Sequence, residues 1–359
     1  MKKHLLLLTF LSVIGNAQIV RKYSNEFLNI GAGARGLAMG GAVISNQNDV
    51  YAPMWNPAGL TEVESDWQGA AMHAEYFESI AKYDYISFAK ALDSKDGVLG
   101  ISIVRLGVDN ILNTTQMIDS EGNIDYDKIS KFSTSDYAGI ISYAFRPGGN
   151  QKLSVGINAK IVYRNIGKFA NGFGFGFDAG AIYREDSGYQ FGAMLRDATT
   201  TVNFWSINQK ELSAVVNGEE FNPAPKDKME ITMPKLNLGV SKNFEINRDL
   251  ELLPEAGLNV DFAKTAAVIS TDFASISPYL GAELSFQKMI FVRAGLNRFQ
   301  TVTDIEDLKR KVSMQPSAGI GIKYKGLTLD YAITNTGIGG SNYFSNFFSL
   351  KLDMRDFRY

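Results

Sequence analysis

Three glycines near the start of the chain form a pattern that could bind a nucleotide. Gly31, Gly33 and Gly36 satisfy G-x-G-x-x-G, in which glycines let the backbone approach a pyrophosphate at a helix N-terminus. That chemistry needs a strand before the glycines, a helix after them and an acidic residue about 20 positions later. Here Gly40 and Gly41 interrupt the expected helix, and no alternation of strands and helices follows. The sequence therefore argues against a dinucleotide site, and these glycines need another explanation.

The other reactive side chains are too few for a familiar catalytic centre. The chain has no cysteine, and His73 is its only histidine after the first few residues. Zinc sites and Ser-His-Asp catalysis both require more such groups. We expect His73 and Glu75 to share one face of a strand, with His73 hydrogen-bonded in a polar interior. The protein is therefore not expected to be an enzyme or to hold a cofactor.

The segment from Asp119 to Lys128 offers oxygen atoms at every second position. Such spacing could hold calcium, but Gly122 is misplaced for an EF-hand loop. A hairpin that turns at residues 121–123 explains the same residues. Both interpretations stay open from sequence alone.

The first 17 residues predict a secretory signal peptide. Lys2 and Lys3 precede an apolar stretch from Leu5 to Ile14, and Ala17 offers a cleavage point. Without those two lysines, 34 basic residues face 38 acidic ones. There is no basic excess to suggest a nucleic-acid partner.

Alternation of apolar and polar residues recurs along the remaining chain. In the segment 151–165, for example, Ile157 and Ile161 share one face while Asn158 and Lys160 share the other. The alternating segments are long enough for outer-membrane strands, which need about 9–11 residues. We expect fourteen strands, at 66–76, 82–92, 97–107, 134–145, 151–165, 172–185, 188–197, 234–244, 250–262, 273–286, 289–299, 313–324, 327–335 and 344–355.

The connections between these strands predict an all-β, antiparallel transmembrane β-barrel. Every second connection is short, and most of the others are longer, including 108–133, 198–233, 263–272, 300–312 and 336–343. Short turns on one rim and long loops on the other are typical of barrels in the outer membrane of Gram-negative bacteria. We therefore expect the chain to contact outer-membrane lipid.

The longest predicted loop, 198–233, carries large apolar side chains. Phe204, Trp205 and Ile207 are the most prominent, and aromatic residues are common anchors of interfaces. They could pack within the loop, bind a partner protein or contact a lipophilic ligand. We favour these three residues as a partner-binding site.

The segment 27–60 resembles the N-terminal region of the PorV/PorQ family, a branch of the FadL-like outer-membrane barrels. The shared residues include Ala34, Arg35, Met39, Gly40, Gly41, Asn48, Asp49, Asn56, Pro57, Ala58, Gly59 and Leu60. The resemblance implies a signal peptide at 1–17, a plug at 18–62 inside the lumen, and a fourteen-stranded barrel at 63–359. Glycines would then permit close packing inside the barrel. Arg35 would meet acidic residues of the lumen, for which the candidates are Asp178, Asp261, Glu283 and Asp330.

The same resemblance implies a function in type IX secretion. A barrel of this kind binds the translocon, or a secreted or cell-surface protein, through its extracellular loops. The motif reads NPAGL at residues 56–60, a form closer to FadL. The alternative function is therefore transport of hydrophobic compounds across the outer membrane.

Overall fold

The structure is a computed structural model that describes residues 24–63, 66–92, 97–216, 219–223, 225, 228–303, 309–337 and 343–354. The strands are β1 (Gln68–Tyr76), β2 (Ala81–Ala91), β3 (Val98–Asn113), β4 (Ser130–Phe145), β5 (Leu153–Ile166), β6 (Ala170–Arg184), β7 (Tyr189–Arg196), β8 (Thr201–Ile207), β9 (Ala214–Val216), β10 (Glu219–Phe221), β11 (Met229–Thr232), β12 (Lys235–Lys242), β13 (Phe244–Glu245), β14 (Leu250–Asp261), β15 (Ile269–Ser270), β16 (Ser275–Phe286), β17 (Ile290–Thr303), β18 (Arg310–Tyr324), β19 (Leu327–Asn335) and β20 (Phe344–Asp353). The helices are η2 (Glu26–Asn29), α2 (Ala34–Ala38), α3 (Ala52–Trp55), η3 (Pro57–Glu62), η4 (Tyr126–Lys128), η5 (Pro147–Gly149) and α4 (Gln209–Leu212).

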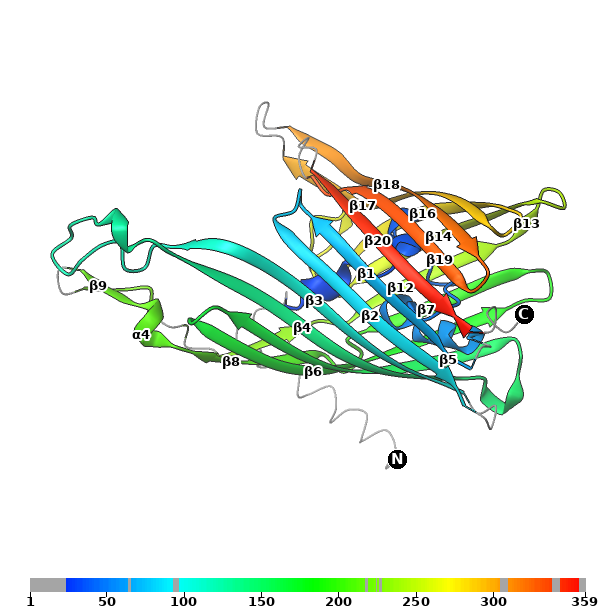
Figure 1. The fold of residues 1–359 in the computed structure, drawn as a ribbon, viewed down its shortest axis with the longest axis horizontal. Coiled ribbons are helices and arrows are strands. Elements are labelled where there is room, and N and C mark those ends of the chain that lie inside the picture. Colours follow the sequence, from blue (N-terminus) through cyan, green and yellow to red (C-terminus); the bar gives the residue numbers. More distant parts are fainter. Residues whose placement is uncertain are drawn as a thin grey trace.

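The strands close into one antiparallel barrel (Figure 1). β1 pairs with β2 on one side and with β20 on the other, so the ring has no free edge. β7 and β8 together fill one place in the ring, as do β11 to β13, and β15 with β16. The described strands therefore form a fourteen-stranded wall, which confirms the predicted fold class.

The two faces of each strand are inverted relative to a water-soluble protein. On β5, Ile157 and Ile161 are 52% and 54% exposed, whereas Asn158 and Lys160 are 1% and 5% exposed. The apolar side chains thus point outwards, where a lipid bilayer would cover them, and the polar ones point into the barrel. The alternation in the sequence predicted these two faces correctly.

Several strands run further than the sequence suggested. β3 continues to Asn113 and β4 begins at Ser130, inside the predicted loop 108–133. The predicted loop 198–233 contains β8, α4, the β9–β10 hairpin and β11. The prediction of a loop is therefore wrong at both ends of that segment, because β8 and β11 continue the wall there. The predicted hairpin turn at residues 217–218 lies outside the described residues.

Residues 24–63 lie inside the ring of strands, in the dark blue part of Figure 1. α2 packs against β17, β18, β19 and β20, and η3 packs against β3, β4, β5 and β6. Most side chains of this luminal segment are buried, including Met39, Tyr51 and Leu60. The boundary at residue 62 and the action of this segment as a plug stay predictions. The expected signal peptide lies outside the described residues.

Candidate functional site: the luminal segment and the wall around it

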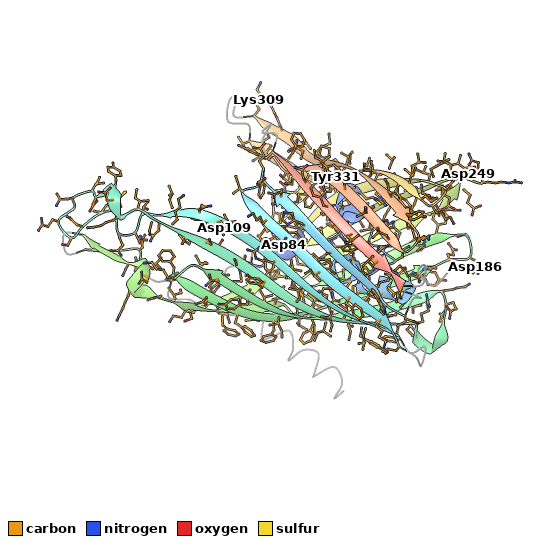
Figure 2. The ribbon with its side chains drawn as sticks, in the orientation of Figure 1. Asp84, Asp109, Asp186, Asp249, Lys309 and Tyr331 are labelled. Atoms are coloured by element: carbon orange, nitrogen blue, oxygen red, sulfur yellow. The ribbon has the colours of Figure 1, made fainter. Side chains whose placement is uncertain are left out.

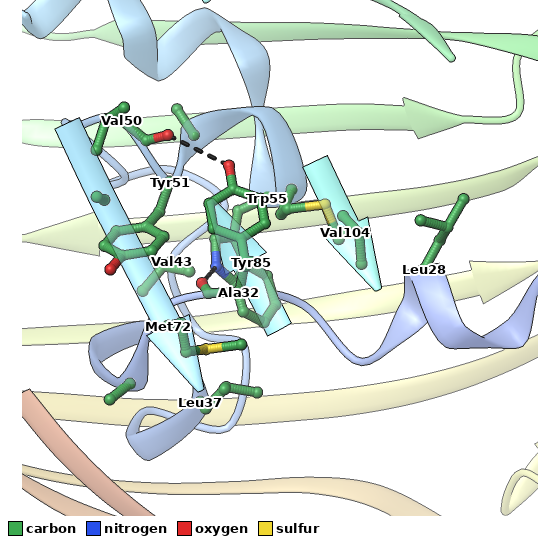
Figure 3. Close-up of a cluster of buried hydrophobic side chains, with 14 of the residues drawn as sticks. Leu28, Ala32, Leu37, Val43, Val50, Tyr51, Trp55, Met72, Tyr85 and Val104 are labelled. Atoms are coloured by element: carbon green, nitrogen blue, oxygen red, sulfur yellow. Dashed lines mark hydrogen bonds between the residues drawn. The ribbon is translucent and has the colours of Figure 1, made fainter. Parts of the chain in front are cut away.

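The glycines of the apparent nucleotide motif lie against two aromatic side chains, Gly31 and Gly36 against Trp55 and Gly33 against Tyr51. A Cβ atom on Gly31 would lie 2.3 Å from the ring of Trp55, and one on Gly36 would lie 2.7 Å from it. The indole Nε1 of Trp55 donates a hydrogen bond to Ala32 O at 2.6 Å, as Figure 3 shows. Gly31 also has a φ of +90°, which favours glycine. These glycines therefore permit close packing around Trp55 and Tyr51 and do not form a phosphate site.

The wall carries matching glycines on its inner face. A Cβ atom on Gly295 would lie 2.1 Å from the carbonyl carbon of Met39, and Gly40 takes a φ of +64° at the same contact. Elsewhere on the wall, a Cβ on Gly192 of β7 would lie 2.3 Å from Ile44 O. The backbone of the luminal segment thus touches the backbone of the wall, which only glycine allows.

Arg35 joins a buried chain of ion pairs. Its Nε lies 2.9 Å from Glu283 Oε2, and Arg293 Nε donates to the same oxygen at 2.5 Å. Arg293 Nη1 continues to Asp330 Oδ1 at 2.6 Å. Of the four acidic residues proposed for Arg35, the structure therefore selects Glu283. Asp178 is instead paired with Lys160, at 2.6 Å.

Asp261, the fourth candidate, lies 3.4 Å from Lys235. It makes no contact with Arg35, because it lies at the end of β14 opposite Ser275, eight positions along the neighbouring β16 from Glu283.

Two further carboxylates bind the luminal segment to the wall. Glu255 of β14 accepts hydrogen bonds from Ile44 N at 2.7 Å, from Ser45 N at 3.1 Å and from Asn46 Nδ2 at 2.8 Å. Asp49 pairs with Lys351 of β20 at 2.7 Å. Burial raises the pKa of Asp49, but the charge of Lys351 and the backbone N–H of Tyr51 bring this pKa below its ordinary value.

Asn56 and Pro57 of the predicted plug motif lie at the start of η3, where they join the luminal segment to the wall. Asn56 Nδ2 donates to Ile44 O at 2.8 Å and to Ala181 O of β6 at 3.1 Å. Its Oδ1 accepts from Ala58 N, so the side chain starts η3. Pro57 occupies the first position of η3, where a missing N–H costs nothing. The motif residues therefore shape the segment and attach it to the wall.

The wall is interrupted where the luminal segment begins. Thr201 of β8 is opposite Thr232, and Arg196 of β7 is opposite Lys235, so four residues (197–200) oppose two (233–234). Asn203 Nδ2 and Thr232 Oγ1 both bind Ser24 near this strand break.

Charged side chains hold both sides of the strand break. Lys160 lies 2.6 Å from Asp178 and 2.7 Å from Asp197, and all three are buried. Arg196 donates to the carbonyl oxygens of Leu28 and Met54 in the luminal segment. Lys160, Arg196 and Glu255 were not singled out from the sequence. Their positions on the polar faces of strands were the only available signal.

The three residues proposed for partner binding lie in the wall. Phe204 is on the outer face of β8, and Trp205 is on the inner face, 5.2 Å from the guanidinium of Arg164. Ile207 is the last residue of β8. Phe204 continues an outward-facing row of register partners, which is Tyr137, Tyr163, Phe173, Phe204 and Met229. Rows of this kind mark the membrane interface of barrels.

The acidic segment 119–128 forms a hairpin. Ile118 pairs with Ile124, and Asp119 Oδ1 accepts from the N–H groups of Glu121 and Asn123, each at 2.9 Å. The side chain of Asn123 is the first cause of a lowered pKa at Asp119. Among the described residues, no group of acidic and histidine side chains is placed to hold a metal ion. Asp119 is therefore a turn-forming residue, as the hairpin alternative predicted.

His73 points away from the lumen, contrary to the sequence-based prediction. Its Nδ1 lies 2.7 Å from Asp84 Oδ1, and its Nε2 lies 3.4 Å from Glu75 Oε1. It does share one strand face with Glu75, but this is the outer face.

No described helix is long and apolar enough to cross a membrane.

Comparison with solved structures identifies the fold. The toluene transporter TbuX of Ralstonia pickettii superposes with a TM-score of 0.55 and 13% identity, over 90% of this chain and 98% of that one. The monoaromatic hydrocarbon channel CymD gives 0.57 and 12%, over 90% and 98%. A FadL homologue of Pseudomonas aeruginosa gives 0.52 and 11%, also over 90% and 98%.

No known family profile and no curated protein matches the chain in sequence. The structural likeness nevertheless shows that the chain shares the barrel fold of these proteins.

Proposed function

We propose that the protein is an outer-membrane channel for small hydrophobic compounds, kept closed in this state by residues 24–63. The observation that carries this proposal is the strand break at residues 197–200, beside the start of the luminal segment. A wall held by a continuous hydrogen-bonded ladder has no sideways exit for a lipophilic solute. At the break, Pro234 has no N–H to donate, and the ladder skips from Thr201 to Arg196.

Apolar groups of the luminal segment support the same function. Phe27 and Leu28 are buried in a cluster with Tyr83 and Val104, and Leu106 packs against it. Leu28 and Val104 are visible at one side of this cluster in Figure 3. Movement of residues 24–30 would uncover apolar side chains next to the break, which suits a small apolar ligand. The shared fold with hydrocarbon channels supports the proposal as well.

Uptake of toluene by cells that produce the protein tests this function. Deleting Ala198 and Thr199 leaves two residues opposite two and preserves the inside–outside alternation. We expect uptake to fall to that of cells lacking the protein, while migration on a gel stays heat-modifiable. Thr199→Ala is the matched control and should transport normally. Full uptake by an intact deletion variant would exclude the sideways route, and no uptake by the natural chain would exclude the function.

A second candidate function is protein binding. It is favoured by the connection between β3 and β4, which exposes apolar side chains. Ile124 and Tyr126 are 56% and 71% exposed on the β3–β4 connection, beyond the aromatic row that contains Phe204. Exposed apolar groups outside the bilayer suit a protein partner. The partner would be the type IX translocon or a secreted or cell-surface protein, as the resemblance to the PorV/PorQ family implies.

Copurification from detergent-extracted outer membranes tests the second candidate. Replacing Ile124 and Tyr126 together by alanine should remove the partner, since one anchor commonly contributes about 2 kcal/mol or more. Phe204→Ala should keep it, because that side chain lies in the membrane-interface row. The opposite pattern would place the binding surface on β8.

A further inference from the structure

Tyr83 is a buried tyrosine whose hydroxyl group is left without a hydrogen bond. It points into the barrel from β2 and is 0% exposed. Its neighbour in the chain, Asp84, is labelled in Figure 2 and belongs to the outer face of the same strand. The Tyr83 hydroxyl has no hydrogen-bond partner among the described residues. A buried polar group without a partner destabilises a fold, so this hydroxyl calls for an explanation.

Other buried tyrosines of the lumen are bonded. The hydroxyls of Tyr51 and Tyr279 each donate to a backbone carbonyl, at 3.0 and 2.7 Å. Tyr85 lies two positions from Tyr83 on the same face of β2, and its hydroxyl is 2.9 Å from Ser102 Oγ. Figure 3 marks a second bond of the Tyr85 hydroxyl, to a backbone oxygen of the luminal segment at 3.4 Å. The described part of the lumen thus supplies a partner for each of these hydroxyls but not for that of Tyr83.

Tyr83 lies beside the sideways route proposed above. Its register partner on β3 is Leu106, and both pack in the apolar cluster that contains Leu28. Arg196, which precedes the strand break, is close enough to act electrostatically on the Tyr83 hydroxyl. The same guanidinium donates to Leu28 O. Movement of residues 24–30 would therefore uncover the hydroxyl within an apolar surface, next to the break.

The charged groups on this side of the lumen balance. Lys160 lies 2.6 Å from Asp178 and 2.7 Å from Asp197. Arg196 interacts electrostatically with the same two carboxylates. Two basic groups thus accompany two acidic ones, and an ionised ligand would find no counter-charge of its own. Burying an unpaired charge is costly, so a ligand at this position is expected to be neutral.

We propose that the Tyr83 hydroxyl binds the oxygen of the transported compound, and that the substrates are small neutral phenols, such as a methylphenol. This inference rests on the proposed function, because a ligand reaches Tyr83 only when residues 24–30 move. The phenyl ring of Phe27, which is 4% exposed, belongs to the same apolar cluster, so its departure makes room for one ring. A site with a buried hydrogen-bonding group discriminates against a ligand that lacks the matching one.

Calorimetric titration of the detergent-purified protein with toluene and with 4-methylphenol tests the proposal, because these ligands differ by one hydroxyl group. We expect Tyr83→Phe to weaken binding of 4-methylphenol about fivefold, the ordinary contribution of one neutral hydrogen bond, and to leave binding of toluene unchanged. Tyr85→Phe is the matched control and should leave the ratio of the two affinities unchanged. Partition into detergent cancels, since each variant is compared with the natural chain for the same ligand. The anion 4-methylbenzoate should bind more weakly than 4-methylphenol.

The outcomes separate this inference from the function on which it rests. An equal effect of Tyr83→Phe on both ligands, an effect on neither, or tighter binding of 4-methylbenzoate would overturn the inference, even if toluene uptake by cells is normal. Absence of binding to the natural chain would overturn it as well. Binding of 4-methylphenol that depends on Tyr83, in a protein that takes up no toluene, would instead exclude the transport function and leave the binding site standing.

The stability of the empty barrel provides an independent check. The Tyr83 hydroxyl has no bond to lose, so Tyr83→Phe should leave the temperature of heat-modification on a gel unchanged or raise it. Tyr85→Phe should lower that temperature, because it removes the bond to Ser102. A fall for Tyr83→Phe as large as that for Tyr85→Phe would show that its hydroxyl is already bonded without a ligand, and the proposal would then be wrong.

Discussion

Replacing Glu283 with glutamine would test whether buried charges hold the luminal segment in place. The carboxylate lies between the guanidinium groups of Arg35 and Arg293, whose side chains are 14% and 2% exposed. Arg293 keeps Asp330, but Arg35 keeps only a neutral hydrogen bond to Asn46. Removing one partner of a buried ion pair typically costs about 3–5 kcal/mol. If that cost falls on docking of the segment, its undocked population rises about 100- to 5000-fold.

Trypsin digestion of liposome-reconstituted protein measures that population, because cleavage after Arg35 requires the segment to leave the lumen. We expect Glu283→Gln to accelerate this cleavage, read by mass spectrometry, by at least about 100-fold. Glu26→Gln is the control, since Glu26 is exposed and 3.3 Å from Lys235, and surface pairs contribute about 0–1 kcal/mol. Equal cleavage of the Glu283 and Glu26 variants would refute the reasoning.

Three further results are expected. Gly295→Val should displace the luminal segment and produce open channels in planar bilayers, whereas Gly139→Val should stay closed, because a Cβ at Gly139 meets nothing within 4 Å; equal conductance would contradict the packing. Deleting residues 31–60 should open a pore in an assembled barrel, and an unchanged, closed conductance would show that the segment does not block it. Because the pKa of Asp119 is lowered in the folded hairpin, its contribution is present above the ordinary aspartate range and is lost as the pH falls through the lowered pKa. Amide exchange at Asn123 should accelerate only in that acidic range, and acceleration near neutral pH would contradict this assignment.

The strands could be predicted closely because a strand alternates its faces whatever surrounds it. The predicted range 327–335 matches β19, and 250–262 differs from β14 by one residue. Prediction failed at 198–233, where β8 and β11 extend the wall beyond the bilayer. Outside the apolar belt the outer face no longer needs to be apolar, as Asn171 and Ser206 at paired positions of β6 and β8 show. The pattern that marks a strand therefore fades before the strand itself ends.

The sequence predicted a luminal segment packed against polar strand faces, but not which charged residues pair with each other. The glycine spacing and Arg35 indicated a segment packed among polar strand faces. Arg35 pairs with Glu283 because Asp178 is already paired with Lys160 and Asp330 with Arg293. These pairings depend on how the ring of strands closes.

The sequence by itself determined the number of strands, their two faces and the compact, glycine-rich character of residues 24–63, because these follow from local periodicity and residue size. Only the tertiary structure decided which face of β1 turned inwards. The alternation of strand faces places His73 and Glu75 on the same side of β1. It does not say whether that side is the inner or the outer one. Closure of the ring decided it, since Met72 and Ala74 pack against the interior and leave the charged pair outside. Burial of Gly295 against Met39 likewise depends on contacts between residues more than 250 positions apart, which no local pattern contains.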